Sequence, residues 1–147
     1  MDKIIFNSKY VNISLDTEKF IFKIDVIKSD EYNEEAFNDF LKYYKQTWLY
    51  IKENNLKYHS MISVLDINDK TVSLPLTAIV KLISVLMELN DVFDKCLHST
   101  CLTINDEKWK DTINLILTLY KPPRPFKLEN NQDEINKFFH CNKIVEK

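Results

Sequence analysis

Residues 61–67 read Met-Ile-Ser-Val-Leu-Asp-Ile, and this nearly continuous apolar run decides the fold. A run with so few polar positions indicates a buried central strand whose two faces are both covered. The polar residues 68–71 follow as a loop, and Pro75 then precedes a second apolar segment. Because proline is favoured at the start of a helix, a long helix is predicted from about Leu76.

This second segment is unusually apolar for a helix. Its polar positions form one narrow stripe. They are Thr77, Lys81, Ser84, Glu88, Asp91 and Lys95. A helix with so thin a polar face is covered on more than one side. We expect the apolar excess, around Val85 and Leu89, to be either core or the contact face of a homodimer.

The residues before this region predict a hairpin and a helix. Apolar residues alternate with polar ones over 11–16 and again over 20–26, with a short polar turn between the two runs. Ile4-Ile5-Phe6 adds a short strand in front. Asn33 then opens a helix with an aromatic stripe on one face, and Asn54-Asn55 ends it in the place that glycine usually takes.

The residues after the second helix repeat the alternation of strand and helix. Residues 100–104 predict a strand, and Asp106 is the expected cap of a third helix that Pro122-Pro123 stops. Residues 125–128 predict a short last strand, and a final helix is expected from about Gln132.

This element order predicts an α/β fold. The sheet is expected to be mixed and mostly parallel, with an N-terminal β-hairpin and about four helices. No internal repeat or linker interrupts the sequence, so residues 1–147 are expected to form a single domain.

The composition excludes several classes of function. The chain has 147 residues and no glycine, which removes the phosphate-binding P-loop, the dinucleotide fingerprint and the usual serine nucleophile elbow. The formal net charge of −2 and the single arginine argue against nucleic acid as a partner. No apolar stretch reaches the ~18 residues of a membrane span.

The expected location is the reducing cytoplasm. The three cysteines are odd in number and show no disulfide pattern, and the first residues lack the long apolar core of a secretory signal. The strong preference for lysine, asparagine and isoleucine is typical of an AT-rich genome, such as that of a large DNA virus.

The order of elements resembles the STAS domain, the fold of bacterial anti-sigma-factor antagonists and of sulfate-transporter tails. The matching features are the strand that ends at Ile67, the loop and long apolar helix after it, and the closing strand and helix from Pro125 to Phe139. The resemblance implies a non-enzymatic protein-interaction domain, acting in regulation or as a scaffold and expected to be a homodimer.

The resemblance places the protein-binding residues in the loop and at the helix start. They are Asn68, Asp69, Lys70, Ser73 and Thr77. Antagonists of this family carry a phosphorylatable serine at this position in an Asp-Ser-Ser-Gly context. Here Ser73 and Thr77 are the nearby hydroxyls and the acid and glycine are missing, which puts a phosphorylation switch in doubt.

The related lipid-carrier fold typified by the CRAL-TRIO domain gives an alternative. It implies a carrier of a lipid or another hydrophobic small molecule, with Phe40, Tyr44 and Trp48 of the aromatic stripe in the pocket. The element order alone does not separate these two interpretations.

Metal binding and catalysis receive less support from the sequence. Cys96, His98, Cys101 and Cys141 are the ligand types that zinc prefers, but their spacing matches no standard zinc site, and single cysteines are often simply buried. No signature pairs a cysteine nucleophile with a histidine and an acid. We therefore expect no cofactor, and an enzyme of undetected type is the third interpretation.

Overall fold

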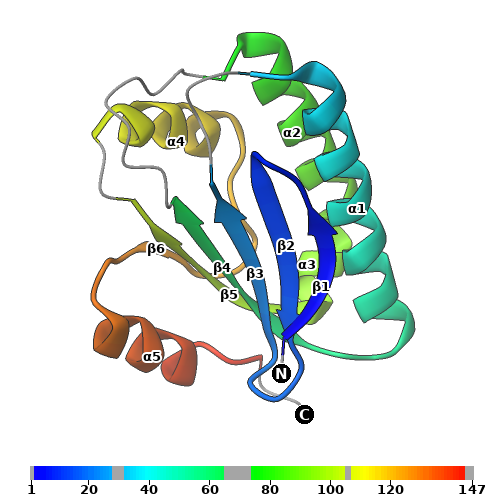
Figure 1. Cartoon of the computed structure of the whole chain (residues 1–147). Helices are drawn as coiled ribbons and strands as arrows, with labels where there is room; N and C mark the ends of the chain where they lie inside the picture. The colour runs from blue at the N-terminus through cyan, green and yellow to red at the C-terminus, as the bar shows by residue number, and fades with distance from the viewer. Residues whose placement is uncertain (1, 28–31, 65–73, 105–106, 145–147) are drawn as a thin grey trace.

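The computed structural model describes residues 2–27, 32–64, 74–104 and 107–144, which form one mixed sheet with helices on both of its faces (Figure 1). The strands are β1 (Asp2–Asn7), β2 (Val11–Asp16), β3 (Ile21–Val26), β4 (Tyr58–Val64), β5 (Leu97–Thr103) and β6 (Phe126–Leu128). The helices are α1 (Glu34–Glu53), α2 (Leu76–Glu88), α3 (Asn90–Cys96), α4 (Glu107–Leu119) and α5 (Gln132–Cys141).

The first three strands form an antiparallel meander, as the period-two alternation predicts. The turn from β2 to β3 is held by the Asp16 carboxylate, which accepts hydrogen bonds from the backbone N–H groups of Glu18 and Lys19 at 3.1 and 3.0 Å. Phe20 takes a positive φ of 59° in this turn, a conformation that usually falls to glycine. The turn therefore forms without glycine.

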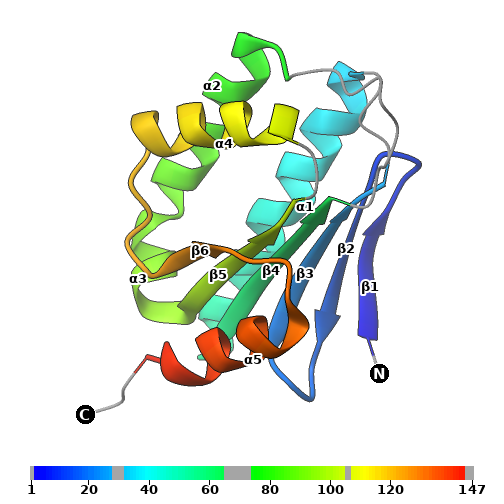
Figure 2. The same ribbon diagram turned by 90° about the vertical axis from the view of Figure 1, so that its left-hand side faces the viewer.

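The remaining strands follow in sequential order. β3, β4, β5 and β6 are parallel neighbours, so the sheet order is β1-β2-β3-β4-β5-β6. Because parallel crossovers are right-handed and each one steps to the next strand in the same direction, α1, α2, α3 and α4 all lie over one face (Figure 2). We call this the helix side of the sheet.

The core of the helix side is built around Trp48 of α1. Its ring stacks on Phe22 of β3, with ring centroids 5.1 Å apart and planes 7° apart, and meets Phe93 of α3 edge-on at 5.3 Å. The helix begins where Asn33 accepts a hydrogen bond from the Ala36 N–H, as predicted. These aromatic contacts hold α1 and α3 on the amino-terminal half of the parallel strands.

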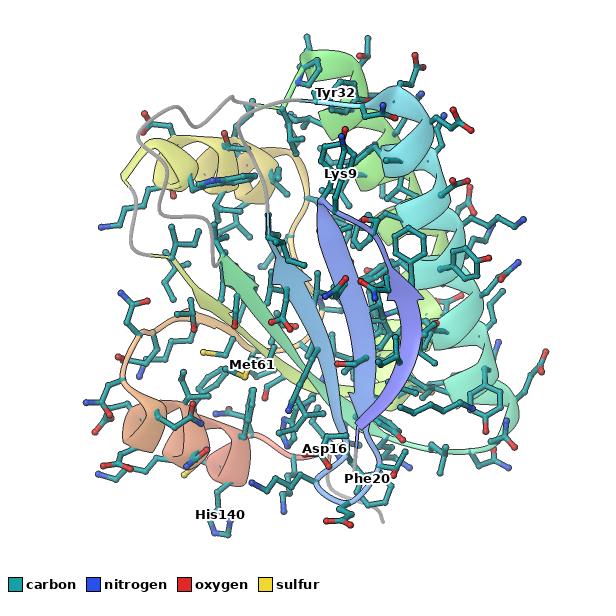
Figure 3. All side chains as sticks on the ribbon, viewed as in Figure 1. Lys9, Asp16, Phe20, Tyr32, Met61 and His140 are labelled. Carbon is teal, nitrogen blue, oxygen red and sulfur yellow. The ribbon has the colours of Figure 1, made fainter. Side chains whose placement is uncertain are left out.

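The opposite face is covered only in part. α5 starts at the Asn131 cap and packs Ile135 and Phe139 against Cys101 of β5. Met61 of β4 points toward this helix (Figure 3). The central strand β4 is thus covered fully by the helix layer and partly by α5.

The predicted fold class is confirmed, with differences in the bounds of the elements. β5 begins at Leu97, earlier than the predicted strand over residues 100–104. β4 begins at Tyr58, earlier than predicted, and residues 65–67 of the predicted strand lie outside the described residues. The predicted long helix is divided into α2 and α3 at Leu89, where the chain bends into the core.

Of the two expectations for the apolar residues around Val85 and Leu89, core or contact face of a homodimer, the structure supports core. Leu89 is only 1% exposed and belongs to the main core, and Val85 packs against the same core. The apolar side chains that α2 leaves exposed lie elsewhere on the helix, at Leu76, Val80 and Met87.

We predict that Trp48→Ala lowers the free energy of unfolding by about 3–5 kcal/mol, because it removes the ring on which two elements pack. Tyr50→Ala on the same helix is the matched control, because Tyr50 is 48% exposed. It should cost less than about 1 kcal/mol. Urea unfolding followed by circular dichroism measures both, and equal losses would contradict the assigned core.

Candidate functional site

The helix side holds a cavity of about 280 Å³ that is partly open to solvent. α2 packs chiefly against α1, α3 and α4 rather than against the strands, so it stands away from the sheet. The space left between helices and strands is the cavity. We call it the helix-side cavity.

The walls of the helix-side cavity come from nearly every element of this layer. The strands supply Val11, Ile24, Val26, Ser60, Ile62, Leu97, Thr100, Leu102 and Phe126. The helices supply Ala36, Phe37, Phe40, Tyr44, Leu82, Leu86, Phe93, Trp109, Ile113, Ile116 and Leu117. The connecting segments supply Tyr10, Tyr32, Asn33, Leu74, Tyr120, Pro122 and Pro123.

The chemistry of these walls is almost wholly apolar. None of the described lining residues is an aspartate, glutamate, lysine, arginine or histidine. Burial raises the pKa of the Tyr44 and Tyr120 hydroxyls, so both stay neutral at physiological pH. Tyr120 donates a hydrogen bond to Asn90 Oδ1 at 3.0 Å, which ties the end of α4 to α3.

Two of the predicted pocket residues lie in these walls. Phe40 and Tyr44 line the cavity on the α1 side, with their rings 5.8 Å apart. Trp48 does not line it, because its ring is fully buried between Phe22 and Phe93. The periodicity of the sequence thus identifies the inner face of α1. It does not show which residues of that face line the cavity and which are buried in the core.

Tyr32 marks the far end of the cavity. It lies above the carboxyl ends of the strands, near the upper ends of α1 and α2 (Figure 3), and its ring packs 5.7 Å from Phe37. Leu74, just before α2, also lines this end. The carboxyl edge of parallel strands is where open α/β sheets commonly bind ligands.

Most of the predicted protein-binding residues cannot be placed. Asn68, Asp69, Lys70 and Ser73 lie outside the described residues. Thr77 is exposed in the first turn of α2. The structure therefore does not place these five residues relative to one another.

The cysteines and histidines considered as zinc ligands do not converge. Cys96 packs in the helix-side core, whereas Cys101 packs against α5 on the opposite face. Cys141 is exposed, and His140 points away from the body of the protein (Figure 3). No cluster of three or more metal-binding side chains occurs in the part of the chain that the structure describes.

A cluster of polar side chains, which the sequence did not reveal, lies under α5. The His59 Nδ1 and the Ser99 hydroxyl are 2.8 Å apart and share a buried hydrogen bond. The His59 ring stacks on Phe139 at 4.5 Å and lies 4.6 Å from the His98 ring. His98 Nδ1 accepts a hydrogen bond from the Ile144 N–H at 2.8 Å, which fastens the segment after α5.

Burial keeps this cluster uncharged. Burial, together with the neighbouring His98 and Lys143, lowers the pKa of His59 to about 3. The pKa of His98 is lowered by burial and by the nearby positive charge of Lys143, Lys57 and Arg124. Because Ser99 is completely buried, the serine–histidine pair is a structural bond rather than a nucleophile open to substrate.

Comparison with family models, with curated proteins and with solved structures finds no match for this chain. Within the described residues, no helix has both the length and the apolar character needed to cross a membrane. The function must therefore be argued from the cavity and the clusters themselves.

We predict that acid destabilises the protein through His59. An unfolded histidine binds a proton near pH 6.5, whereas folded His59 stays neutral to about pH 3. The free energy of unfolding should therefore fall as the pH drops from about 6.5 toward 3, by at most ~1.4 kcal/mol per pH unit for one histidine. Urea unfolding between pH 7.5 and 4.5 measures this slope.

His59→Gln should make this slope shallower. His140→Gln removes an exposed histidine and is the matched control, which should keep the wild-type slope. An unchanged slope in His59→Gln would show that other groups cause the acid sensitivity.

Proposed function

We propose that this protein binds an apolar small molecule in the helix-side cavity and acts as a carrier. The proposal rests on the cavity itself. Its volume is about 280 Å³, and its apolar walls come from the strands, the helices and the connecting segments. Small-molecule sites are typically concave and mostly apolar, with volumes from about 300 Å³ upward. The cavity lies at the lower end of this range.

The partly buried apolar side chains around the cavity support a bound occupant. Covering apolar surface is worth roughly 25 cal/mol per Å². Leu82 and Leu86 of α2 and Ile113 and Leu117 of α4 line the cavity and remain only partly buried. An apolar ligand would supply the contacts that these side chains lack.

The position of α2 suggests how such a ligand is covered. α2 contacts α4 through Ile79, Ile83 and Ile116, and these two helices form the outer wall of the cavity. The described lining offers no carboxylate or imidazole for general acid–base chemistry. We therefore propose binding rather than chemical conversion.

A STAS-like interaction domain that forms a homodimer is the second candidate. It rests on the exposed apolar side chains of α2, where Leu76, Val80 and Met87 are 66%, 53% and 63% exposed. With 3.6 residues per turn these three lie within about 40° around the helix, so they form one stripe. A second copy of the chain, packing the same stripe across a two-fold axis, would cover it.

We predict that the purified protein binds the uncharged fluorescent probe N-phenyl-1-naphthylamine in this cavity. Ala36 lines the cavity at the start of α1, so Ala36→Phe should fill part of it and weaken probe binding at least about tenfold. Ser84→Phe is the matched control, because Ser84 is exposed on α2 and does not line the cavity. It should bind the probe as the wild type does.

Native mass spectrometry of freshly purified protein complements this titration. Extra mass that is lost on denaturation would identify the class of a co-purifying ligand. Equal probe binding by wild type and Ala36→Phe would argue against the cavity as the site.

For the second candidate we predict that Val80→Lys combined with Met87→Lys shifts a dimer to monomer in sedimentation velocity. Ser84→Lys adds one lysine, rather than two, to the same exposed side of α2 and removes no apolar contact, so it should shift the equilibrium much less. A wild-type protein that is monomeric at high micromolar concentration would contradict the homodimer.

A further inference from the structure

In the described parallel strands β3 to β6, two positions on the helix side are polar, and both line the cavity. In β3 the inward positions are Phe22, Ile24 and Val26. In β4 and β5 the row that continues from Phe22 holds Ser60 and Thr100, whereas the next row holds Ile62 and Leu102. Both Ser60 and Thr100 line the helix-side cavity.

These two hydroxyls are neighbours. Ser60 and Thr100 are paired across the parallel strands β4 and β5, which lie about 4.8 Å apart. Phe22 flanks the pair on one side and Phe126 on the other, in the same row. This row of the sheet thus has a polar centre between two aromatic residues, of which Phe126 also lines the cavity.

The residue type at these positions is informative. A buried polar residue in an otherwise apolar surface is far less common than an apolar one, and Ser60 is only 3% exposed. Hydroxyl groups both donate and accept hydrogen bonds, so the pair can bind an alcohol or a carbonyl oxygen.

The indole of Trp109 adds a donor to the walls, which also hold the Tyr44 and Tyr120 hydroxyls. The Trp109 Nε1 is buried and has no hydrogen-bond partner among the described residues. A buried donor without a partner costs about 1–3 kcal/mol, and a ligand oxygen would satisfy it. All of these groups are neutral.

Among the described lining residues, no side chain of opposite charge is present to pair with a charged ligand head. The described lining holds no cationic and no anionic side chain, and the only arginine of the chain donates to the Leu97 and His98 carbonyls. Burying a carboxylate or phosphate without a cation is strongly unfavourable. This argues against a fatty-acid anion or a phospholipid head in the cavity.

We infer that the ligand is an uncharged, predominantly apolar molecule with one oxygen group, an alcohol or a carbonyl, that the hydroxyls of Ser60 and Thr100 hold at the floor of the helix-side cavity. This inference rests on the proposed carrier function and names its ligand class. A small ligand of this kind suits a cavity of about 280 Å³ that is partly open to solvent.

The test compares two ligands of equal length in competition with N-phenyl-1-naphthylamine at pH 8. Decanol should displace the probe, whereas decanoate, which is ionised at this pH, should bind at least about tenfold more weakly. This comparison uses the wild-type protein and needs no variant. Decanoate that binds as tightly as decanol would overturn the inference.

A variant then tests the two hydroxyls directly. Ser60→Ala combined with Thr100→Val keeps the shape of the floor and removes both hydroxyls. It should weaken decanol binding about 5–20-fold, as expected for lost hydrogen bonds, and leave binding of the probe within about twofold. Unchanged decanol affinity in the folded variant would contradict the assigned role.

These outcomes separate the inference from the proposed function. Probe binding that Ala36→Phe weakens, together with equal affinity for decanol and decanoate, would leave the carrier proposal standing and overturn the ligand class. Absence of any probe, decanol or decanoate binding would overturn both.

Discussion

The handedness of the parallel crossovers is the constraint on which the rest of this structure depends. Each connection from β3 onward steps to the neighbouring strand in the same direction, so right-handed crossovers place four successive helices on one face. α1 and α3 occupy the sheet surface through the Trp48 and Phe93 rings. α2 then packs mainly on other helices, whereas α4 packs on α2 and, through Trp109 and Ile113, on the sheet. The space that remains between these helices and the strands is the cavity.

The absence of glycine imposes a second constraint, on the turns. Phe20 and Asn55 adopt a positive φ. The side chains of Asn33 and Asn131 cap α1 and α5. These turns are therefore held by side-chain hydrogen bonds, as at Asp16, rather than by backbone freedom alone. Without glycine the chain cannot bring its backbone unusually close to a phosphate, which is consistent with recognition by side chains in an apolar cavity.

The sequence predicts those features that depend on local periodicity. Alternation locates the meander of β1 to β3, and the aromatic stripe locates the inner face of α1, including Phe40 and Tyr44. It could not separate Trp48, a core residue, from its neighbours, because cavity and core share one apolar pattern. The bend at Leu89 and the His59–Ser99 bond also escape prediction, since both depend on contacts between distant elements.

The serines and threonines of β4 and β5 show how the two faces of the sheet differ. Ser99 lies on the α5 side and is accounted for by its hydrogen bond to His59, and Thr103 donates to the Glu129 carbonyl oxygen on the same side. Ser60 and Thr100 lie on the helix side, where the structural core is otherwise apolar. The Ser99 and Thr103 hydroxyls on the α5 side thus form hydrogen bonds within the fold itself. The Ser60 and Thr100 hydroxyls on the helix side line the cavity, where a bound molecule would be their partner.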